Sequence, residues 1–222
     1  MTNGFKNKII SASKKLGIAM PKNPSQNFEK IKVTWTHEGQ VLRIVLASPP
    51  ANILDGQTMS EIRVCINQAA EEKSLKVVVF EGEGKHFCFG ASVQEHVKEK
   101  AGEMISGFHG LFKDLLAMRT PLIALVRGQC LGGGMELALF CNFIIAEPRA
   151  KFGQPEIQLG VLPPVAAALL PGIIGQSRAD DMILTGRSID AETARQWGLV
   201  HAVAEDVEAT LEAALKERGL AS

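Results

Sequence analysis

The sequence lacks the cysteine and histidine patterns that hold metal ions. None of its four cysteines forms a C-x-x-C pair, and its five histidines form no H-E-x-x-H motif. Each cysteine lies in apolar sequence, which is typical of a buried, reduced thiol in a cytoplasmic protein. We therefore expect no metal site, and we expect the histidines at the surface or in loops. The cysteines are Cys65, Cys88, Cys130 and Cys141.

An excess of charge of either sign is also missing. The 222 residues include 24 basic and 24 acidic side chains, so no overall charge attracts the protein to nucleic acid or to an anionic membrane. No apolar run approaches the roughly 18 to 20 residues of a membrane span, and the N-terminus lacks a secretory signal. We expect a cytoplasmic protein of one domain that binds neither nucleic acid nor membrane.

Residues 1–28 differ from the rest of the chain. They carry five lysines, and no acidic residue occurs before Glu29. We predict a loosely attached basic arm, either disordered or helical. A mitochondrial transit peptide is less favoured, because such segments are rich in arginine and this one has none.

From residue 31 onward, short β-rich runs alternate with helical patterns. Two runs joined by a polar, glycine-containing turn predict a hairpin, and apolar residues at helical spacing follow. A valine-rich run then predicts a buried strand, so the order is strand, helix, strand, and the fold class is α/β. Strands are predicted at 31–35, 41–46, 76–81, 122–126, 143–146 and 199–204, and helices at 60–72, 93–118, 176–186, 190–198 and 207–218.

Three consecutive glycines, Gly132, Gly133 and Gly134, lie between a predicted strand and a helix. Without Cβ atoms their N–H groups can approach a ligand closely, and the start of the helix adds a positive dipole end. Tight packing alone would also select small residues here. The run matches neither the G-x-G-x-x-G nor the G-x-x-x-x-G-K-S/T motif that binds nucleotide phosphates.

Two glutamates follow this glycine run. Glu136 stands at the edge of an otherwise apolar helix, where a carboxylate is costly to bury, although it also stabilises a helix N-terminus. Glu156 follows Gln154-Pro155 in a predicted loop, where an exposed charge on its own would be ordinary. Together with a polarised carbonyl, two such acids can transfer protons.

Four segments in order resemble the enoyl-CoA hydratase, or crotonase, superfamily. The resemblance covers roughly residues 30 to 205, and several spaced motifs agree. It implies a crotonase-like spiral of repeated strand, strand, helix units, (ββα)n. The segments are Lys85-His86-Phe87-Cys88-Phe89-Gly90-Ala91, Thr120-Pro121-Leu122-Ile123-Ala124, Gly128 through Glu136, and Phe152 through Glu156 with Leu159-Gly160.

In this family two backbone N–H groups form an oxyanion hole that binds the thioester carbonyl of an acyl-CoA. The resemblance places them on Phe89 and Gly133. It implies that Glu136 and Glu156 hold a water molecule and transfer its protons, without showing which is the base. Coenzyme A is part of the substrate, and no further cofactor is expected.

Departures from the common hydratase pattern bear on the acyl group. Ser92 and Asn142 replace usual aspartates, and an alanine-rich segment, 164–171, replaces a glycine-rich one. With the segment 49–55, these features resemble the cyclic dienoyl-CoA hydratases, which convert cyclohexa-1,5-diene-1-carbonyl-CoA to 6-hydroxycyclohex-1-ene-1-carbonyl-CoA in the degradation of aromatic compounds. The predicted substrate-binding residues are Ala51, Ile53, Phe87, Gly90, Ala91, Ser92, Gly132, Pro163, Ala166 and Ala167.

The resemblance also bears on domains and assembly. It predicts a core at 29–205 and the start of a C-terminal helical region at 206–222, which family members usually extend further. We expect either a truncated sequence or a chain without those helices. A homotrimer or hexamer is expected, as in the family. Two alternatives to hydration remain: double-bond isomerisation by the same fold, and a non-catalytic acyl-CoA-binding subunit.

Overall fold

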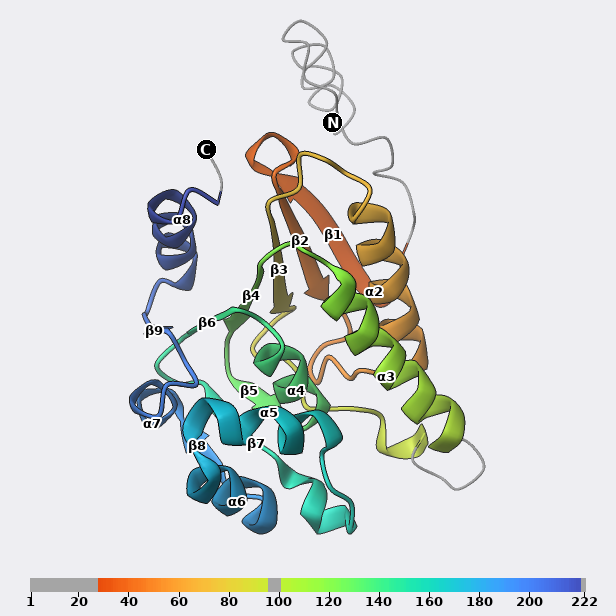
Figure 1. The fold of residues 1–222 in the computed structure, drawn as a ribbon, viewed down its shortest axis with the longest axis vertical. Coiled ribbons are helices and arrows are strands. Elements are labelled where there is room, and N and C mark those ends of the chain that lie inside the picture. Colours follow the sequence, from red (N-terminus) through yellow and green to blue (C-terminus); the bar gives the residue numbers. More distant parts are fainter. Residues whose placement is uncertain (1–27, 96–100, 221–222) are drawn as a thin grey trace, which may run out of the picture.

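The computed structural model describes residues 28–95 and 101–220. At its centre is a six-stranded sheet with the order β1-β2-β3-β4-β6-β9 (Figure 1). The first two strands form an antiparallel hairpin, and the other neighbouring strands of this sheet pair in parallel. The strands are β1 (Ile31–Thr36), β2 (Val41–Leu46), β3 (Val77–Gly82), β4 (Leu122–Val126), β6 (Phe143–Ala146) and β9 (Ala202–Val203).

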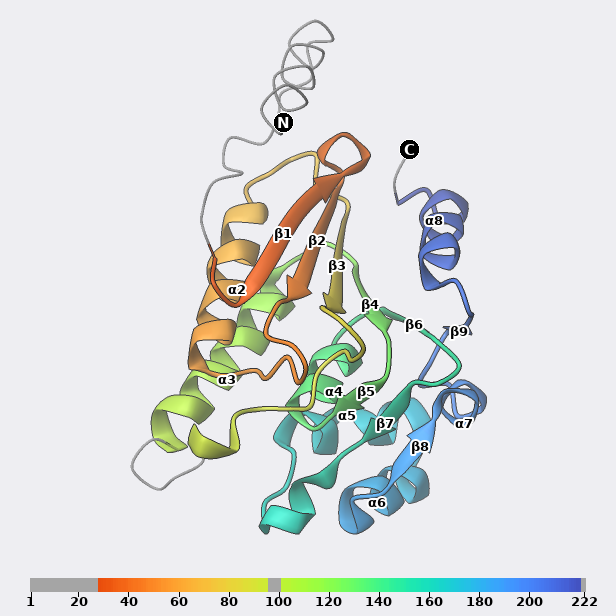
Figure 2. The same ribbon diagram turned by 180° about the vertical axis from the view of Figure 1, so that it is seen from behind.

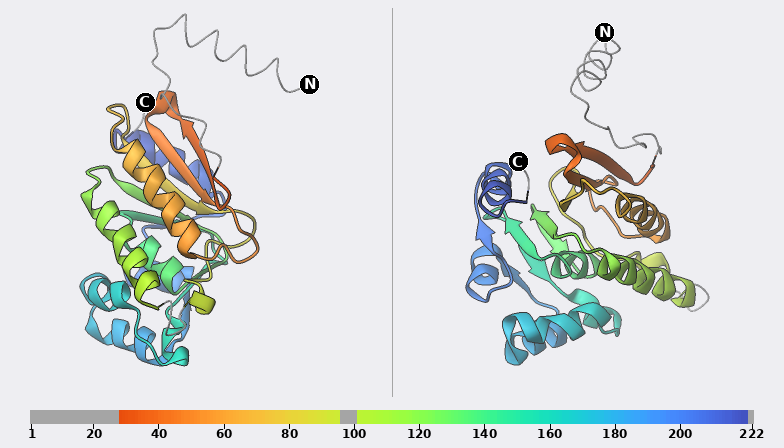
Figure 3. Two further views of the ribbon diagram at one scale, coloured as in Figure 1. Left: turned by 90° about the vertical axis from the view of Figure 1, so that its right-hand side faces the viewer. Right: turned by 45° about the horizontal axis from the view of Figure 1, so that its top comes forward.

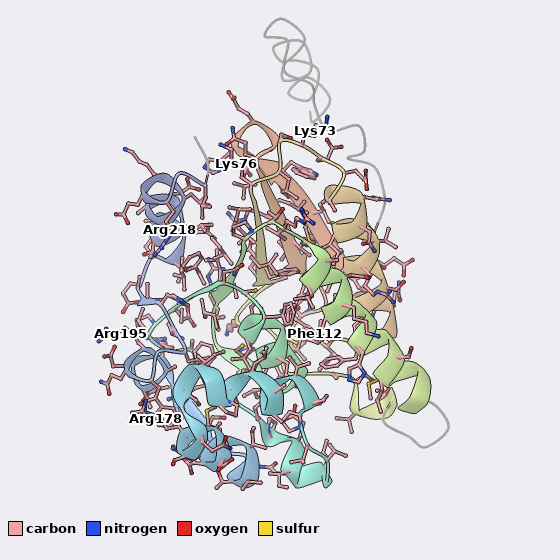
Figure 4. All side chains as sticks on the ribbon, viewed as in Figure 1. Lys73, Lys76, Phe112, Arg178, Arg195 and Arg218 are labelled. Atoms are coloured by element: carbon pink, nitrogen blue, oxygen red, sulfur yellow. The ribbon has the colours of Figure 1, made fainter. Side chains whose placement is uncertain are left out.

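Helices cover both faces of this sheet, as a parallel sheet with apolar strands requires. On one face, α2 (Gly56–Ala69) and α3 (Ala101–Ala117) pack side by side (Figure 3). Phe112 of α3 is buried there, whereas Lys73 and Arg195 lie at the periphery (Figure 4). On the other face, α8 (Val207–Glu217) packs against residues of β2, β3, β4 and β6.

A second, three-stranded sheet has the order β5-β7-β8 and lies below the large sheet in the view from behind (Figure 2). Strand β5 leads directly into the short helix α4, which therefore begins at the junction of the two sheets. The remaining elements follow around it: β5 (Gln129–Leu131), β7 (Lys151–Gly153), β8 (Ser188–Asp190), α4 (Gly133–Leu139), α5 (Pro164–Ile174), α6 (Gln176–Thr185), α7 (Ala191–Gln196), and the 3-10 turns η1 (His37–Gly39), η2 (Val93–Glu95) and η3 (Pro155–Leu159).

The α/β class and the predicted hairpin are confirmed, and the strands at 122–126 and 143–146 have the predicted bounds. Helix α2 begins four residues before the predicted start, because the Asp55 side chain accepts the Thr58 N–H at 2.7 Å and caps the helix there. Of the predicted helix at 93–118, residues 96–100 lie outside the described residues. So does the predicted basic arm, apart from Phe28.

Three strands and one α-helix were not predicted. Strands β5, β7 and β8 have three residues each, which is too short for an alternating pattern to be recognised. Helix α5 begins with Pro164 and contains Pro171. Proline fits the first turn of a helix but is unfavourable in its interior, so the segment gave no clear helical signal.

Candidate active site

A cavity of about 370 Å³ lies beside the glycine run. Its wall comes from the loop after β3, from α3, from the start of α4 and from the segment between β7 and α5. Most of the lining residues are apolar, and both Glu136 and Glu156 contribute to the wall. An apolar pocket with a few converging polar groups is the usual form of a small-molecule site.

Glu136 lies in the first turn of α4 and is only 2% exposed. Its Oε1 accepts the backbone N–H groups of Val165 at 2.7 Å and Ala166 at 2.9 Å, both in the first turn of α5. Burial nevertheless raises the pKa of Glu136 to about 7, because desolvation of the carboxylate outweighs these two bonds, and the charge of Glu156 adds to the rise. Glu136 therefore changes its protonation state near neutral pH.

Glu156 lies in η3, on the other side of the glycine run. The side-chain amide of Gln154, which is fully buried, lies 3.1 Å and 3.0 Å from the two carboxylate oxygens and donates to both when its nitrogen faces them. Pro155 opens the turn and separates these two residues in sequence. The local sequence Gln-Pro-Glu thus holds the carboxylate of Glu156 in a fixed orientation beside the cavity.

Each of the three glycines has a different close neighbour. A Cβ on Gly132 would lie 2.7 Å from Oε1 of Glu156, and this residue also has a φ of +51°. A Cβ on Gly133 would lie 3.1 Å from the backbone nitrogen of Ala91, and one on Gly134 would lie 2.5 Å from Cβ of Cys88. The run therefore lets a carboxylate, a loop and a thiol all approach the start of one helix.

The structure contradicts Phe89 as an oxyanion-hole donor. Its backbone N–H donates to the carbonyl of Ala51 at 2.9 Å, so it is already engaged and directed away from the cavity. Its side chain does line the cavity, is 39% exposed, and packs edge-on against the ring of His86 with centroids 5.0 Å apart.

The geometry favours Ala91 in its place. Leu54 donates to the carbonyl of Gly90, and Ser92 donates to the carbonyl of Leu54. In such a parallel bridge the residue between these two groups directs its own N–H to the opposite side. Among the described residues, neither the Ala91 N–H nor the Gly133 N–H has an acceptor. Both residues line the cavity.

The other predicted substrate-binding residues divide into two groups. Gly90, Ala91, Gly132 and Pro163 line the cavity, as Gly133 does. The rest do not. Phe87 and Ala166 are fully buried in the core, and Ala166 contributes only its backbone N–H, to Glu136. Ala167 is exposed on α5, and Ala51, Ile53 and Ser92 are half-buried behind the loop.

Ten of the eighteen residues that line the cavity were not predicted. Helix α3 supplies an apolar face with one histidine, and the segment after Glu156 supplies another apolar stretch. The helical spacing of α3 gave a signal for a buried face, but nothing in it distinguished a cavity wall from core. These residues are Val93, Met104, Ile105, Phe108, His109, Pro155, Leu159, Val161, Leu162 and Pro164.

Comparison with known proteins identifies this arrangement. The model of a family described as enoyl-CoA hydratase/isomerase matches residues 36–219, which is most of the chain. The chain belongs to the enoyl-CoA hydratase/isomerase family. Within the described residues of this family member, no three His, Cys, Asp or Glu side chains form a group that could hold a metal ion. None of its described helices is long and apolar enough to cross a membrane.

Solved structures confirm the crotonase-like fold of this family member. DspI of Pseudomonas aeruginosa superposes with a TM-score of 0.82 at 31% identity, covering 90% of this chain and 77% of that one. An enoyl-CoA hydratase subunit I from Geobacillus kaustophilus gives a TM-score of 0.79 at 33% identity, covering 88% and 77%.

Two curated relatives are named as hydratases. The chain is 42% identical to cyclohexa-1,5-dienecarbonyl-CoA hydratase of Thauera aromatica, over 83% of this chain and 72% of that protein. It is 40% identical to a probable enoyl-CoA hydratase of Mycobacterium bovis, over 72% and 63%. The chain thus spans about two thirds of the length of these relatives. Their names support an enzyme of the hydro-lyase class.

Proposed function

We propose that this family member adds water to a conjugated enoyl- or dienoyl-CoA thioester. The observation that carries the proposal is that two carboxylates, Glu136 and Glu156, line the same cavity as the two backbone N–H groups of Ala91 and Gly133. Hydration needs this combination, because negative charge develops on the thioester oxygen while hydroxide from a water molecule adds to one carbon and a proton adds to another.

In the proposed reaction the thioester oxygen accepts hydrogen bonds from the Ala91 and Gly133 N–H groups. Hydroxide from the bound water adds to one carbon of the double bond, and a glutamate takes the remaining proton of that water. Electron density moves toward the thioester oxygen, where the two N–H donors stabilise it. A proton from a carboxyl group is then delivered to the other carbon of the double bond in an enoyl-CoA. In the dienoyl-CoA it is delivered to the far end of the second double bond, and the remaining double bond stays conjugated with the thioester. In both cases the elements of one water molecule are added.

The protonation of Glu136 suits this cycle. Its pKa of about 7 allows the carboxyl group to gain and lose a proton near neutral pH, as a general acid or base must. The mutual repulsion of the two carboxylates favours a state in which the pair holds one proton. Two backbone donors on Oε1 and the Gln154 amide on Glu156 keep both groups oriented while the proton moves.

We further propose cyclohexa-1,5-diene-1-carbonyl-CoA as the substrate and 6-hydroxycyclohex-1-ene-1-carbonyl-CoA as the product. The identity to the Thauera aromatica enzyme supports this acyl group. So does the cavity, since Phe89 and Phe108 line it with prolines and offer flat apolar surface to a planar ring. Such a reaction belongs to the degradation of aromatic compounds.

The proposal extends to the setting of the enzyme. Coenzyme A enters as part of the substrate, and the chemistry requires no further cofactor. The four cysteines are free and buried, which supports a reducing, cytoplasmic location. We propose assembly as a homotrimer or hexamer, as expected from the resemblance.

The test is to incubate the purified 222-residue chain with crotonyl-CoA and with cyclohexa-1,5-diene-1-carbonyl-CoA, following the absorbance of the conjugated thioester and the products by mass. Hydration predicts loss of absorbance with crotonyl-CoA and a change of absorbance with the dienoyl-CoA, whose hydrated product keeps one conjugated double bond. In both cases the product is heavier by one water. Rearrangement without added mass would favour isomerisation. Binding without any product would favour a non-catalytic acyl-CoA-binding subunit. Rearrangement alone or binding alone would contradict the hydratase proposal.

A further inference from the structure

A fully buried cysteine lies directly behind the loop that carries the Ala91 N–H, and the proposed chemistry does not use it. Cys88 is 0% exposed. Its Sγ accepts the backbone N–H of Gly90 at 3.3 Å, and the Gly90 carbonyl oxygen lies 3.7 Å from the same sulfur. The thiol therefore contacts both polar groups of the residue that precedes Ala91.

These contacts determine where the Ala91 N–H points. The Gly90 carbonyl and the Ala91 N–H belong to one planar trans peptide unit, so they point in opposite directions. Leu54 donates to that carbonyl at 3.0 Å, and the thiol lies on the same side. Holding the carbonyl toward Leu54 and Cys88 turns the Ala91 N–H toward the cavity. The positive φ of Gly90, +121°, is part of the same turn.

Cys88 also contacts the second donor's helix. A Cβ on Gly134 would lie 2.5 Å from Cβ and 2.6 Å from Sγ of Cys88, so the cysteine side chain occupies the space that this glycine leaves open. Gly134 immediately follows Gly133. On one side the thiol thus meets the loop that carries the Ala91 N–H, and on the other it meets the helix start that carries the Gly133 N–H.

We propose that Cys88 is a positioning residue that sets the direction and separation of the two oxyanion-hole N–H groups at Ala91 and Gly133. The inference rests on the proposed function, since it assigns a role toward that oxyanion hole. A purely structural role would predict only a loss of stability when the thiol is removed. A positioning role predicts a change in the polarisation of the bound thioester.

The chain contains a matched control. Cys130 is also 0% exposed and lies opposite Cys88 in an isolated bridge between the two segments. Among the described residues its thiol makes no hydrogen bond to the loop 89–91. Removing Sγ from Cys130 creates a comparable buried cavity without touching the Gly90 peptide.

The experiment compares the wild type with Cys88→Ala, Cys88→Ser and Cys130→Ala. For each protein, kcat and KM are measured with the thioester that the wild type hydrates. The red shift of bound 4-dimethylaminocinnamoyl-CoA reports the polarisation of its carbonyl. We expect Cys88→Ala to lower kcat about tenfold, as the loss of one well-placed hydrogen bond would, with KM within about twofold and a smaller red shift. Cys88→Ser should recover most of both, because its hydroxyl accepts the same N–H, and Cys130→Ala should change neither.

The proposal is overturned if Cys88→Ala keeps the wild-type kcat and red shift, or if Cys130→Ala loses as much of either. Should Cys88→Ala fail to fold, Cys88→Val takes its place, since it fills the space without a polar atom. Equal activity of the valine and serine variants then overturns the proposal. If the wild type turns over no conjugated thioester, the proposed function is contradicted instead. This result is distinguishable, because the wild type is assayed before any variant.

Discussion

At the scale of single residues, burial of the Glu136 carboxyl group destabilises its ionised form. The same burial gives the group a pKa that suits proton transfer near neutral pH. Two backbone donors hold one of its oxygens, yet burial still raises its pKa to about 7. A carboxyl group whose folded pKa exceeds its usual value of 4.5 binds more protons in the folded state between these two pH values. Its contribution to stability is therefore complete at acidic pH and is lost as the pH rises toward and through 7.

The substitution Glu136→Gln should separate the two effects. The amide oxygen can still accept both backbone bonds, but the group no longer ionises. We expect turnover to fall about 10² to 10⁴-fold, while the free energy of unfolding at pH 8 rises by about 1 to 3 kcal/mol relative to the wild type. At pH 4 to 5 the two proteins should be equally stable. Urea denaturation at both pH values, with turnover measured alongside, checks this, and a stability difference that does not depend on pH would contradict it.

Gly132 offers a second residue-scale prediction. An alanine there would bring Cβ to 2.7 Å from the Glu156 carboxylate, at a φ of +51°. We expect Gly132→Ala to lower kcat about a hundredfold, because a catalytic group displaced by about 1 Å loses that much.

The control for this variant is Gly219→Ala, which has a similar φ of +61° but open space around its Cβ. Both variants place an alanine at positive φ, and the backbone cost is larger at Gly132, because its ψ of −131° lies outside the left-handed helical region. Thermal unfolding should show a loss of stability for each. Only Gly132→Ala should lose activity. Full activity of Gly132→Ala would show that Glu156 does not need its present position.

Some of the site residues could be predicted from the sequence and others could not. Glu136 and Glu156 were predicted from their residue type and spacing, and the structure brings both to one cavity. The sequence prediction placed one donor on Phe89, two residues before the Ala91 N–H that we propose from the hydrogen bonds of the loop. Which of the three successive N–H groups of residues 89–91 is free depends on the acceptors supplied by Ala51 and Cys88, and on the Leu54 N–H that holds the Gly90 carbonyl. Those contacts exist only once the loop is folded.

At the scale of elements, a charged cluster joins α8 to the sheet on the face opposite the cavity. Glu81 of β3 accepts from Arg43 at 2.6 Å and from Arg127 at 3.4 Å, and Glu208 of α8 accepts from the same two arginines at 2.9 Å each. The two positive and two negative charges balance. Glu81 is 8% exposed, so the two arginines are the partners that compensate its buried charge.

Removal of one charge from this cluster tests its role. We expect Glu81→Gln to lower the free energy of unfolding by about 2 to 3 kcal/mol, because two partly buried arginines then share one carboxylate. Turnover of the folded enzyme should be unchanged, since the cluster lies across the sheet from the site. Asp181→Asn breaks an exposed pair with Arg187 and should cost no more than about 0.5 kcal/mol. Equal costs for the two variants in chemical denaturation would rule out a special role for the buried cluster.

Elements with long apolar patterns were predictable, and short ones were not. The valine-rich β3 and the isoleucine-rich β6 are buried because of their own composition. Strands β5, β7 and β8 exist because they pair with one another, so their three-residue segments carry little information individually. The second sheet, which precedes and positions the glycine run, could therefore be recognised only in the structure.

At the scale of the whole molecule, several large apolar side chains face outward. Leu159 and Leu162 at the cavity wall are 56% and 59% exposed, and Leu184 on α6 is 62% exposed. Exposed apolar surface of this kind is often covered by another protein chain or by a ligand. It is consistent with the proposed self-association.

We expect the purified chain to have the mass of a homotrimer or hexamer in size-exclusion chromatography with light scattering. The mass should stay constant as the protein is diluted through the micromolar range, because the large interfaces of permanent oligomers dissociate only at lower concentrations. A monomer at every concentration tested would contradict the proposed assembly.

The bond between the Phe89 N–H and the Ala51 carbonyl has a consequence for engineering. It frees position 89 from any catalytic duty of its backbone, while its side chain stays in the wall of the cavity. The side chain at position 89 then affects which acyl group binds, whereas the reaction depends on a backbone N–H elsewhere in the same loop. A library of substitutions at this one position should therefore yield enzymes that prefer acyl chains of other shapes and still hydrate them.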